Sequence, residues 1–296
     1  MKKLWAFGPA LIVLAAFLWA LDGIIRRSLY SLPPLTIVFY EHLLGFLVIA
    51  PFLLPYLKRE KLMRKEWVAL IWVSFFSGLM GTLWFTTALL STNFIPFSVV
   101  FLLQKLQPVF AISAGAFLLK ERLTPRYGIY AILALILAYF VTFPYGKVNF
   151  DTGNDTMIAA LYAVGAAFAW GSSTAVSRFA LLKHSQTLIT GLRFFFTSIM
   201  AFFALTLFSK VALVIPQGSE LLRFLFIALS TGMVALWIYY KGLKTTQTKI
   251  ATILELVFPV TAVGIDVFLY HSVLAPVQYL SAVLLLVVVW RISKIS

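Results

Sequence analysis

The 296-residue sequence contains no cysteine and few charged residues. Without cysteine, the chain forms neither a disulfide bond nor a thiolate metal site. Charged residues make up 11% of the chain, against about 25% in a soluble domain, and 62% of the residues are hydrophobic. A soluble fold of this size cannot bury so much apolar surface. A soluble enzyme, a disordered chain and a free nucleic-acid-binding domain are therefore excluded, and we expect an integral membrane protein.

Acidic residues are scarce, with 10 Asp and Glu against 24 Lys and Arg. In membrane proteins, Lys and Arg are enriched in the cytoplasmic loops, so their excess sets the orientation. If both termini are cytoplasmic, the inner side carries most of these cations. The outer side then holds Arg26, Arg27, Lys147, Lys210 and Arg223. We expect the basic charge to fix topology in the inner membrane rather than to bind nucleic acid.

Ten apolar segments approach the roughly 20 residues that a helix needs to cross the hydrocarbon core. They are approximately 4–25, 35–55, 67–88, 94–118, 127–143, 156–177, 187–208, 221–241, 248–269 and 275–290. The segments are too long and too uniformly apolar for barrel strands. The sequence therefore predicts an all-α membrane protein with ten spans and both termini cytoplasmic.

The two halves of the chain match at an offset of 151 residues, and we call residues related by this offset counterparts. Val13-x-Ala15-Ala16-Phe17-x-Trp19 falls on Val164-x-Ala166-Ala167-Phe168-x-Trp170. Each half contains an odd number of spans, five, so the second half is inverted in the membrane, as in many secondary transporters. We expect a first repeat over 1–143, an external linker over 144–155 and a second repeat over 156–296.

The sequence offers little for catalysis. No loop is long enough to form a soluble domain, and no Gly-x-x-x-x-Gly-Lys phosphate loop occurs. The three histidines are too scattered to suggest a metal site, and no Gly-x-Ser-x-Gly motif is present. We therefore expect a carrier driven by gradients, with no enzymatic activity, no cofactor and no bound metal.

Ionisable residues inside membrane spans are costly and usually functional. Lys105 lies in the fourth span, and Glu255 in the ninth is the counterpart of Gln104. Lys105 and Glu255 either clamp the carboxylate and amine of a substrate or form a structural ion pair between the halves. Gln104 and Gln107 add polar groups to the same candidate substrate-binding site.

Four further polar residues are candidates for gating or for carrying protons, namely Asp22, Glu41, His42 and Arg193. His42 and Arg193 are counterparts. Asp22 precedes Arg26 by one helical turn, so a simple ion pair between them is the alternative interpretation.

Proline and aromatic residues also recur at matching depths. Pro108 and Pro259 are counterparts that we expect to bend their helices, because proline cannot donate a backbone hydrogen bond. Aromatic side chains either line a cavity for an aromatic or cationic group or pack within the protein and against lipid. As a group they predict an aromatic-lined cavity, and the candidates are Trp19, Trp84, Trp170, Trp237 and Tyr239.

Two stretches resemble a known family. Leu106-Gln107-Pro108-Val109-Phe110, followed by Leu119-Lys120-Glu121-Arg122-Leu123-Thr124-Pro125, resembles Leu-Glu-Pro-Val-Phe and Gly-Glu-Arg-Leu-Thr in the EamA-like branch of the drug/metabolite transporter superfamily. The resemblance covers nearly the whole chain. It implies a cavity lined by spans one, three, four, six, eight and nine. It also implies that spans five and ten support the fold or form a homodimer contact.

Together these features predict a carrier that moves a small metabolite across the inner membrane by alternating access. The resemblance favours an amino acid as substrate and export as the direction. Two alternatives remain: a cationic amine held by the aromatic residues and Glu255, or, in a different class, a channel or lipid scramblase. The expected partners are the small-molecule substrate and membrane lipid.

Overall fold

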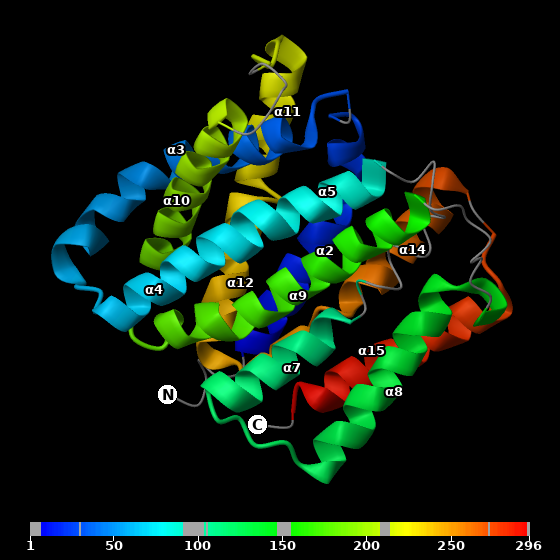
Figure 1. Ribbon diagram of the computed structural model, residues 1–296. Coiled ribbons are helices and arrows are strands. Elements are labelled where there is room, and N and C mark those ends of the chain that lie inside the picture. Colours follow the sequence, from blue (N-terminus) through cyan, green and yellow to red (C-terminus); the bar gives the residue numbers. More distant parts are fainter. Residues whose placement is uncertain are drawn as a thin grey trace.

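The computed structural model describes residues 7–29, 31–90, 104, 106–146, 155–207, 214–271 and 273–294, and the regular elements in these ranges are helices (Figure 1). Six helical segments are long and apolar enough to cross a membrane. They are Pro34–Arg59, Arg64–Ala88, Pro125–Thr142, Gln186–Leu207, Gly218–Thr245 and Thr248–Ile265. Shorter apolar helices cover Phe7–Asp22, Gln107–Leu118 and Pro276–Ile292. The chain is thus an all-helical, multi-pass membrane protein.

Within the described residues, the elements begin and end close to the expected span boundaries, but residues 94–103 of the expected fourth span lie outside the described residues. The first half contains α2 (Phe7–Arg27), α3 (Pro34–Arg59), α4 (Arg64–Val73), η1 (Ser74–Gly81), α5 (Thr82–Leu90), α7 (Gln107–Leu118), α8 (Pro125–Thr142) and the short turn η3 (Pro144–Gly146). The second half contains α9 (Asp155–Leu181), α10 (Gln186–Leu207), α11 (Gly218–Leu229), α12 (Met233–Thr245), α13 (Thr248–Leu254), α14 (Val257–Tyr270) and α15 (Pro276–Ile292). Most of the expected linker lies outside the described residues.

Helices of the two halves pack against one another in matching pairs. Helix α2 packs on α12 and α14, and α9, which contains the counterparts of α2, packs on α4, η1, α5 and α7. Helix α3 packs on α10, and α8 lies beside α15 (Figure 1). The internal repeat of the sequence is therefore also a repeat of packing contacts.

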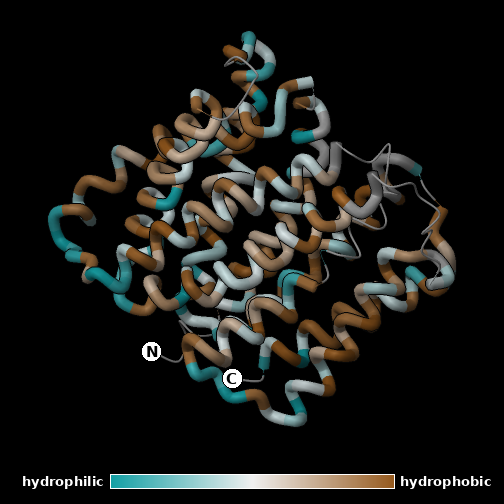
Figure 2. The backbone as a smooth tube through the Cα atoms, in the orientation of Figure 1, coloured by the Kyte–Doolittle hydropathy of each residue, from teal (hydrophilic) through white to brown (hydrophobic). Residues whose placement is uncertain are grey.

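The pair formed by α8 and α15 has a broad apolar exterior (Figure 2). Ile129 and Ile132 on α8 are exposed, as are Leu280 and Val283 on α15. In water this surface would be unfavourable, whereas in a bilayer the lipid chains cover it. These two helices, expected as spans five and ten, contact each other within one chain.

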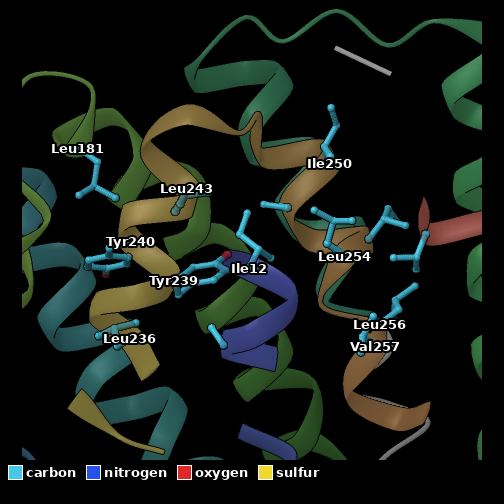
Figure 3. Close-up of a cluster of buried hydrophobic side chains, with 14 of the residues drawn as sticks. Ile12, Leu181, Leu236, Tyr239, Tyr240, Leu243, Ile250, Leu254, Leu256 and Val257 are labelled. Atoms are coloured by element: carbon cyan, nitrogen blue, oxygen red, sulfur yellow. The ribbon is translucent and has the colours of Figure 1, made fainter. Parts of the chain in front are cut away.

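A buried cluster of hydrophobic residues joins α2 to α12 and α13 (Figure 3). Ile12 on α2 lies among Leu243 and Tyr239 of α12 and Leu254 of α13. Figure 3 also shows the adjacent residues Tyr239 and Tyr240 pointing to different sides of α12. The core thus fixes the position of α12, whose residues Tyr239 and Tyr240 face different neighbouring helices.

Three expected spans are interrupted rather than continuous. The span 67–88 contains the π-helical segment η1, where the backbone hydrogen-bond pattern changes. Two side chains of the second half meet its carbonyl groups: Thr197 Oγ1 donates to Ser74 O at 3.0 Å, and Trp170 Nε1 donates to Ser77 O at 3.1 Å. Short π-helical segments within α-helices are frequent at functional sites.

Two glycines allow this close approach. A Cβ atom at Gly78 would lie 2.1 Å from Thr197 Oγ1, and one at Gly81 would lie 2.6 Å from Trp170 Nε1. Gly232, the counterpart of Gly81, is the last residue of the interruption between α11 and α12. The corresponding spans of both halves are therefore irregular at the same depth.

The third interruption falls at Glu255 and Leu256, between α13 and α14. Pro259 consequently lies in the first turn of α14, and Pro108 lies in the first turn of α7. A missing N–H in the first turn costs no intrahelical hydrogen bond. At these prolines the structure shows new helices beginning, where the sequence predicted bends within continuous helices.

We predict that Gly78→Ala destabilises the protein by about 1–3 kcal/mol, because the added methyl group displaces Thr197 and its hydrogen bond to Ser74. The measurement is the thermal unfolding midpoint in detergent. Gly128→Ala is the matched control, since a Cβ atom there meets nothing within 4 Å. Equal midpoints for the two variants would contradict the role assigned to this contact.

Candidate substrate-binding site

Glu255 lies at the interruption between α13 and α14, and its side chain is half-buried. Its Oε2 accepts a hydrogen bond from Gln107 Nε2 at 2.9 Å, and its Oε1 accepts one from Tyr239 OH at 2.5 Å. Gln107 belongs to the first half of the chain and the other two residues to the second. Three spans therefore converge on one carboxyl group within the membrane.

Trp19 adds an aromatic surface to this group. Its ring centroid lies 5.1 Å from that of Tyr239, with an angle of 51° between the ring planes. Trp19 is half-buried, whereas Tyr239 is almost fully buried. A few directed polar groups beside aromatic rings are typical of small-molecule sites. We call Trp19, Gln107, Tyr239 and Glu255 the central site.

A second polar network lies on the other side of α12. Arg193 Nη1 donates to Tyr240 OH at 2.6 Å, and Arg193 Nη2 donates to Ser77 Oγ at 2.8 Å. Ser177 Oγ and Tyr240 OH share a further hydrogen bond at 2.8 Å. Because Tyr239 and Tyr240 are adjacent, this network is connected to the central site through the backbone of α12.

The electrostatics of Arg193 are unusual for a buried guanidinium group. Its hydrogen-bond partners are neutral hydroxyl groups, and within the described residues it forms no ion pair and its Nε has no partner. Arginine stays protonated in proteins, so the charge remains. The network thus places a buried positive charge next to the π-helical segment.

The other tryptophans predicted to line the cavity have separate partners. Trp170 bonds to Ser77 and packs against Phe85, with 5.1 Å between the ring centroids. Trp237 Nε1 donates to Thr187 Oγ1 at 2.9 Å, and Trp84 lies against Gly165. Of the four tryptophans, Trp19 alone has a described contact within the central site.

The remaining predicted polar residues in the fourth span give less information. Gln104 is helical and half-buried, but no contact places its side chain in the central site. Lys105 lies outside the described residues, so the expected pairing with Glu255 is not addressed by the structure.

At one end of the bundle, four side chains form a buried ion cluster. Arg26 Nε lies 2.5 Å from Asp22 Oδ2, and Arg26 Nη1 lies 3.0 Å from Glu41 Oε2. Thr231, in the interruption between α11 and α12, donates to Asp22 Oδ1 at 2.5 Å. We call these four residues the outer cluster, after the side of the membrane that the sequence predicts for them. The cluster connects α2 and α3 with the break between α11 and α12, and it includes the ion pair between Asp22 and Arg26 that the sequence offered as an alternative.

His42 lies next to Glu41 but has different partners. Its Nδ1 is 2.8 Å from the carbonyl oxygen of Val38, so a proton on Nδ1 is donated there. Its ring packs on Phe194, with 4.9 Å between centroids. The counterparts His42 and Arg193 are both buried, but they do not bond to each other.

A second ion cluster contains residues that the sequence analysis assigned no role. Arg178 Nη1 lies 3.3 Å from Glu121 Oε1, and Arg178 Nε donates to Thr246 O at 2.7 Å. The Glu121 carboxylate also accepts the backbone N–H groups of Thr248 and Lys249. We call this second cluster the inner cluster, after the side of the membrane that the sequence predicts for it. It joins α9, the loop after α7 and the start of α13. The sequence signal was Glu121 itself, within the motif that resembles Gly-Glu-Arg-Leu-Thr.

Comparison with known proteins agrees with this architecture. The EamA-like transporter family matches the chain twice, over residues 6–143 and 157–294. The riboflavin transporter ImpX of Fusobacterium nucleatum subsp. nucleatum is 37% identical over 297 residues, which cover 98% of this chain and 98% of the relative. A crystal structure of a protein at 19% identity has a TM-score of 0.77 and covers 97% of this chain and 96% of that chain, a likeness that shows the fold.

Both repeats of the chain match the family, and the relative is similar along almost its entire length. The chain therefore belongs to the EamA-like transporter family of the drug/metabolite transporter superfamily, and it is a multi-pass membrane transporter of small metabolites, not an enzyme.

Proposed function

We propose that this protein is a gradient-driven carrier of a flavin such as riboflavin. The observation that carries the proposal is the central site, where Glu255 is held by Gln107 and Tyr239 beside the ring of Trp19. Riboflavin has a flat, aromatic ring system with an imide edge and a polyhydroxylated chain. An aromatic ring stacks on such a surface, while amide and carboxyl groups bond to the imide and the hydroxyls. The name of the 37% identical relative supports the same substrate.

The proposed topology has ten spans, both termini in the cytoplasm and an inverted second half in the inner membrane. The basic loops support this orientation. The start of α2 and the end of α15 lie at one end of the bundle, which supports an even number of spans (Figure 1). The outer and inner clusters then lie on opposite sides of the central site. In alternating access, one cluster opens while the other stays closed.

An exported amino acid is the second candidate. The observation that favours it is the pair of opposite charges on the two sides of α12, Glu255 and Arg193. A zwitterion would place its ammonium group toward Glu255 and its carboxylate toward Arg193. This arrangement requires Arg193 to exchange its hydroxyl partners for the substrate, whereas the flavin requires no such exchange.

We predict that liposomes containing the purified protein and preloaded with riboflavin take up labelled riboflavin in a saturable, trans-stimulated manner. Preloading with amino acids, in the same preparation, tests the second candidate. Trans-stimulation by an amino acid but not by riboflavin would overturn the flavin proposal. Entry that is not saturable and not accelerated by trans substrate would indicate a channel instead of a carrier.

We predict that Glu255→Gln slows this exchange at least tenfold. Glutamine is neutral, so Tyr239 and Gln107 no longer bond to a carboxylate. A hydrogen bond to a charged group contributes about 1.5–3 kcal/mol, which corresponds to a factor of ten or more. Glu220→Gln is the matched control, because glutamine preserves the capping interaction of Glu220 with Gln217. Unchanged exchange by the Glu255 variant, at an unchanged unfolding midpoint, would remove Glu255 from the site.

We predict that Asp22→Asn opens the outer side. The substitution removes a charge from the buried ion cluster with Arg26, and a loss of about 1.4 kcal/mol shifts a two-state equilibrium tenfold. Because the chain has no cysteine, a single Gln104→Cys probe reports access to the interior. Labelling by an impermeant maleimide from the outside should be several times faster in the Asp22 variant.

The inner cluster provides the opposite control for this experiment. Arg178→Gln breaks the ion pair with Glu121 and should make the probe less accessible from the outside. If both substitutions changed the labelling rate in the same direction, the two clusters would not act as alternating gates.

A further inference from the structure

A cavity of about 430 Å³ opens beside the inner cluster. Its lining comes from the loop after α7, the end of α9 and the connection between α12 and α13. The lining residues are Leu119, Lys120, Glu121, Arg122, Thr124, Arg178, Gln247 and Lys249. This cavity is separate from the central site, because the two share no lining residue.

The cavity has an excess of positive charge. It contains four cationic side chains, and its carboxylate, Glu121, is occupied by Arg178 and by two backbone N–H groups. Lys249 Nζ bonds to the carbonyl oxygen of Arg122. Among the described residues, the exposed side chains of Lys120 and Arg122 have no ion-pair partner. The cavity therefore presents uncompensated cations to an incoming anion.

Lys120 occupies a backbone position that favours glycine. Its φ angle is +54°, directly after the end of α7, where the N–H groups of Leu119 and Glu121 both bond to Gly115 O. Its counterpart His271 has a φ of +53°, so the repeat sets this conformation at both places. In the motif that this stretch resembles, the residue is glycine. A lysine here strains the backbone, and strain of this kind points to a function of the side chain.

Exposed apolar residues flank these lining residues in the sequence. Phe117, at the end of α7, is 90% exposed, and Leu118 and Leu123 on either side of the loop are exposed as well. These residues place the loop at the edge of the apolar region of the membrane. A ligand that satisfies both features has an anionic head and apolar chains.

We propose that this cavity binds the headgroup of an anionic phospholipid of the cytoplasmic leaflet. The phosphodiester lies between Lys120 and Arg122, and the acyl chains lie on Phe117 and Leu123. Basic pockets between membrane helices on the cytoplasmic side are known to bind anionic headgroups. The leaflet follows from the proposed orientation, while the binding itself is independent of the transported substrate.

The test compares lipid retention by the purified full-length protein and its Lys120→Gly variant. Both are incubated with equal amounts of phosphatidylglycerol and phosphatidylcholine, and the bound lipid is counted by native mass spectrometry. We expect the variant to retain phosphatidylglycerol about fivefold more weakly, the effect of one basic residue near an anionic headgroup. Its thermal midpoint should be equal or higher, because glycine relieves the strain at φ +54°.

Lys61→Gly is the matched control, since Lys61 is an exposed lysine in another loop. It should retain phosphatidylglycerol like the unmodified protein. Equal retention by the Lys120 variant, or equal retention of phosphatidylcholine and phosphatidylglycerol by the unmodified protein, would overturn the proposal. Displacement of the lipid by millimolar inorganic phosphate would also overturn it, by identifying a site for free phosphate.

Discussion

The structure depends on one constraint: inside a membrane, each backbone N–H and C=O group needs a partner within the protein. A regular helix meets this requirement alone, but an interrupted helix leaves groups unpaired. Here the partners come from the other half of the chain, as when Trp170 and Thr197 donate to carbonyl groups of η1. The irregular segment η1 of the first repeat is therefore hydrogen-bonded to side chains of the second repeat.

Charge follows the same rule, because a buried ion requires partners as well. Arg26 is shared between two carboxylates, and Glu121 between a guanidinium group and two backbone N–H groups. In the central site, by contrast, the described hydrogen-bond donors to the Glu255 carboxyl group are neutral, and Glu255 is half-buried. Among the described residues Glu255 forms no ion pair, so a ligand that binds there replaces hydrogen bonds from neutral donors.

The sequence predicted the helical class, the membrane location and the family, because these follow from long apolar segments and from motifs. It also predicted Glu255, Gln107, Tyr239 and Trp19 as candidate site residues, since polar and aromatic residues within apolar spans are conspicuous, and the structure brings these four side chains together. It did not predict the π-helical segment, whose carbonyl groups bond to Thr197 and Trp170, two residues distant in the sequence that lie against Gly78 and Gly81. Nor did it predict that Trp84, Trp170 and Trp237 have separate partners. The helical period predicts on which face of its helix a residue lies, but not which residue of another helix it contacts.

The position of Tyr239 and Tyr240 on α12 has a thermodynamic consequence. One residue bonds to Glu255 of the central site, and the next bonds to Arg193, which also holds Ser77 of η1. If binding at Glu255 shifts α12, it changes the free energy of the contact between Arg193 and η1. Linkage is reciprocal, so whatever strengthens or weakens that contact alters ligand affinity by the same factor. The two adjacent tyrosines would then determine the coupling free energy between ligand binding at Glu255 and the contact of Arg193 with η1.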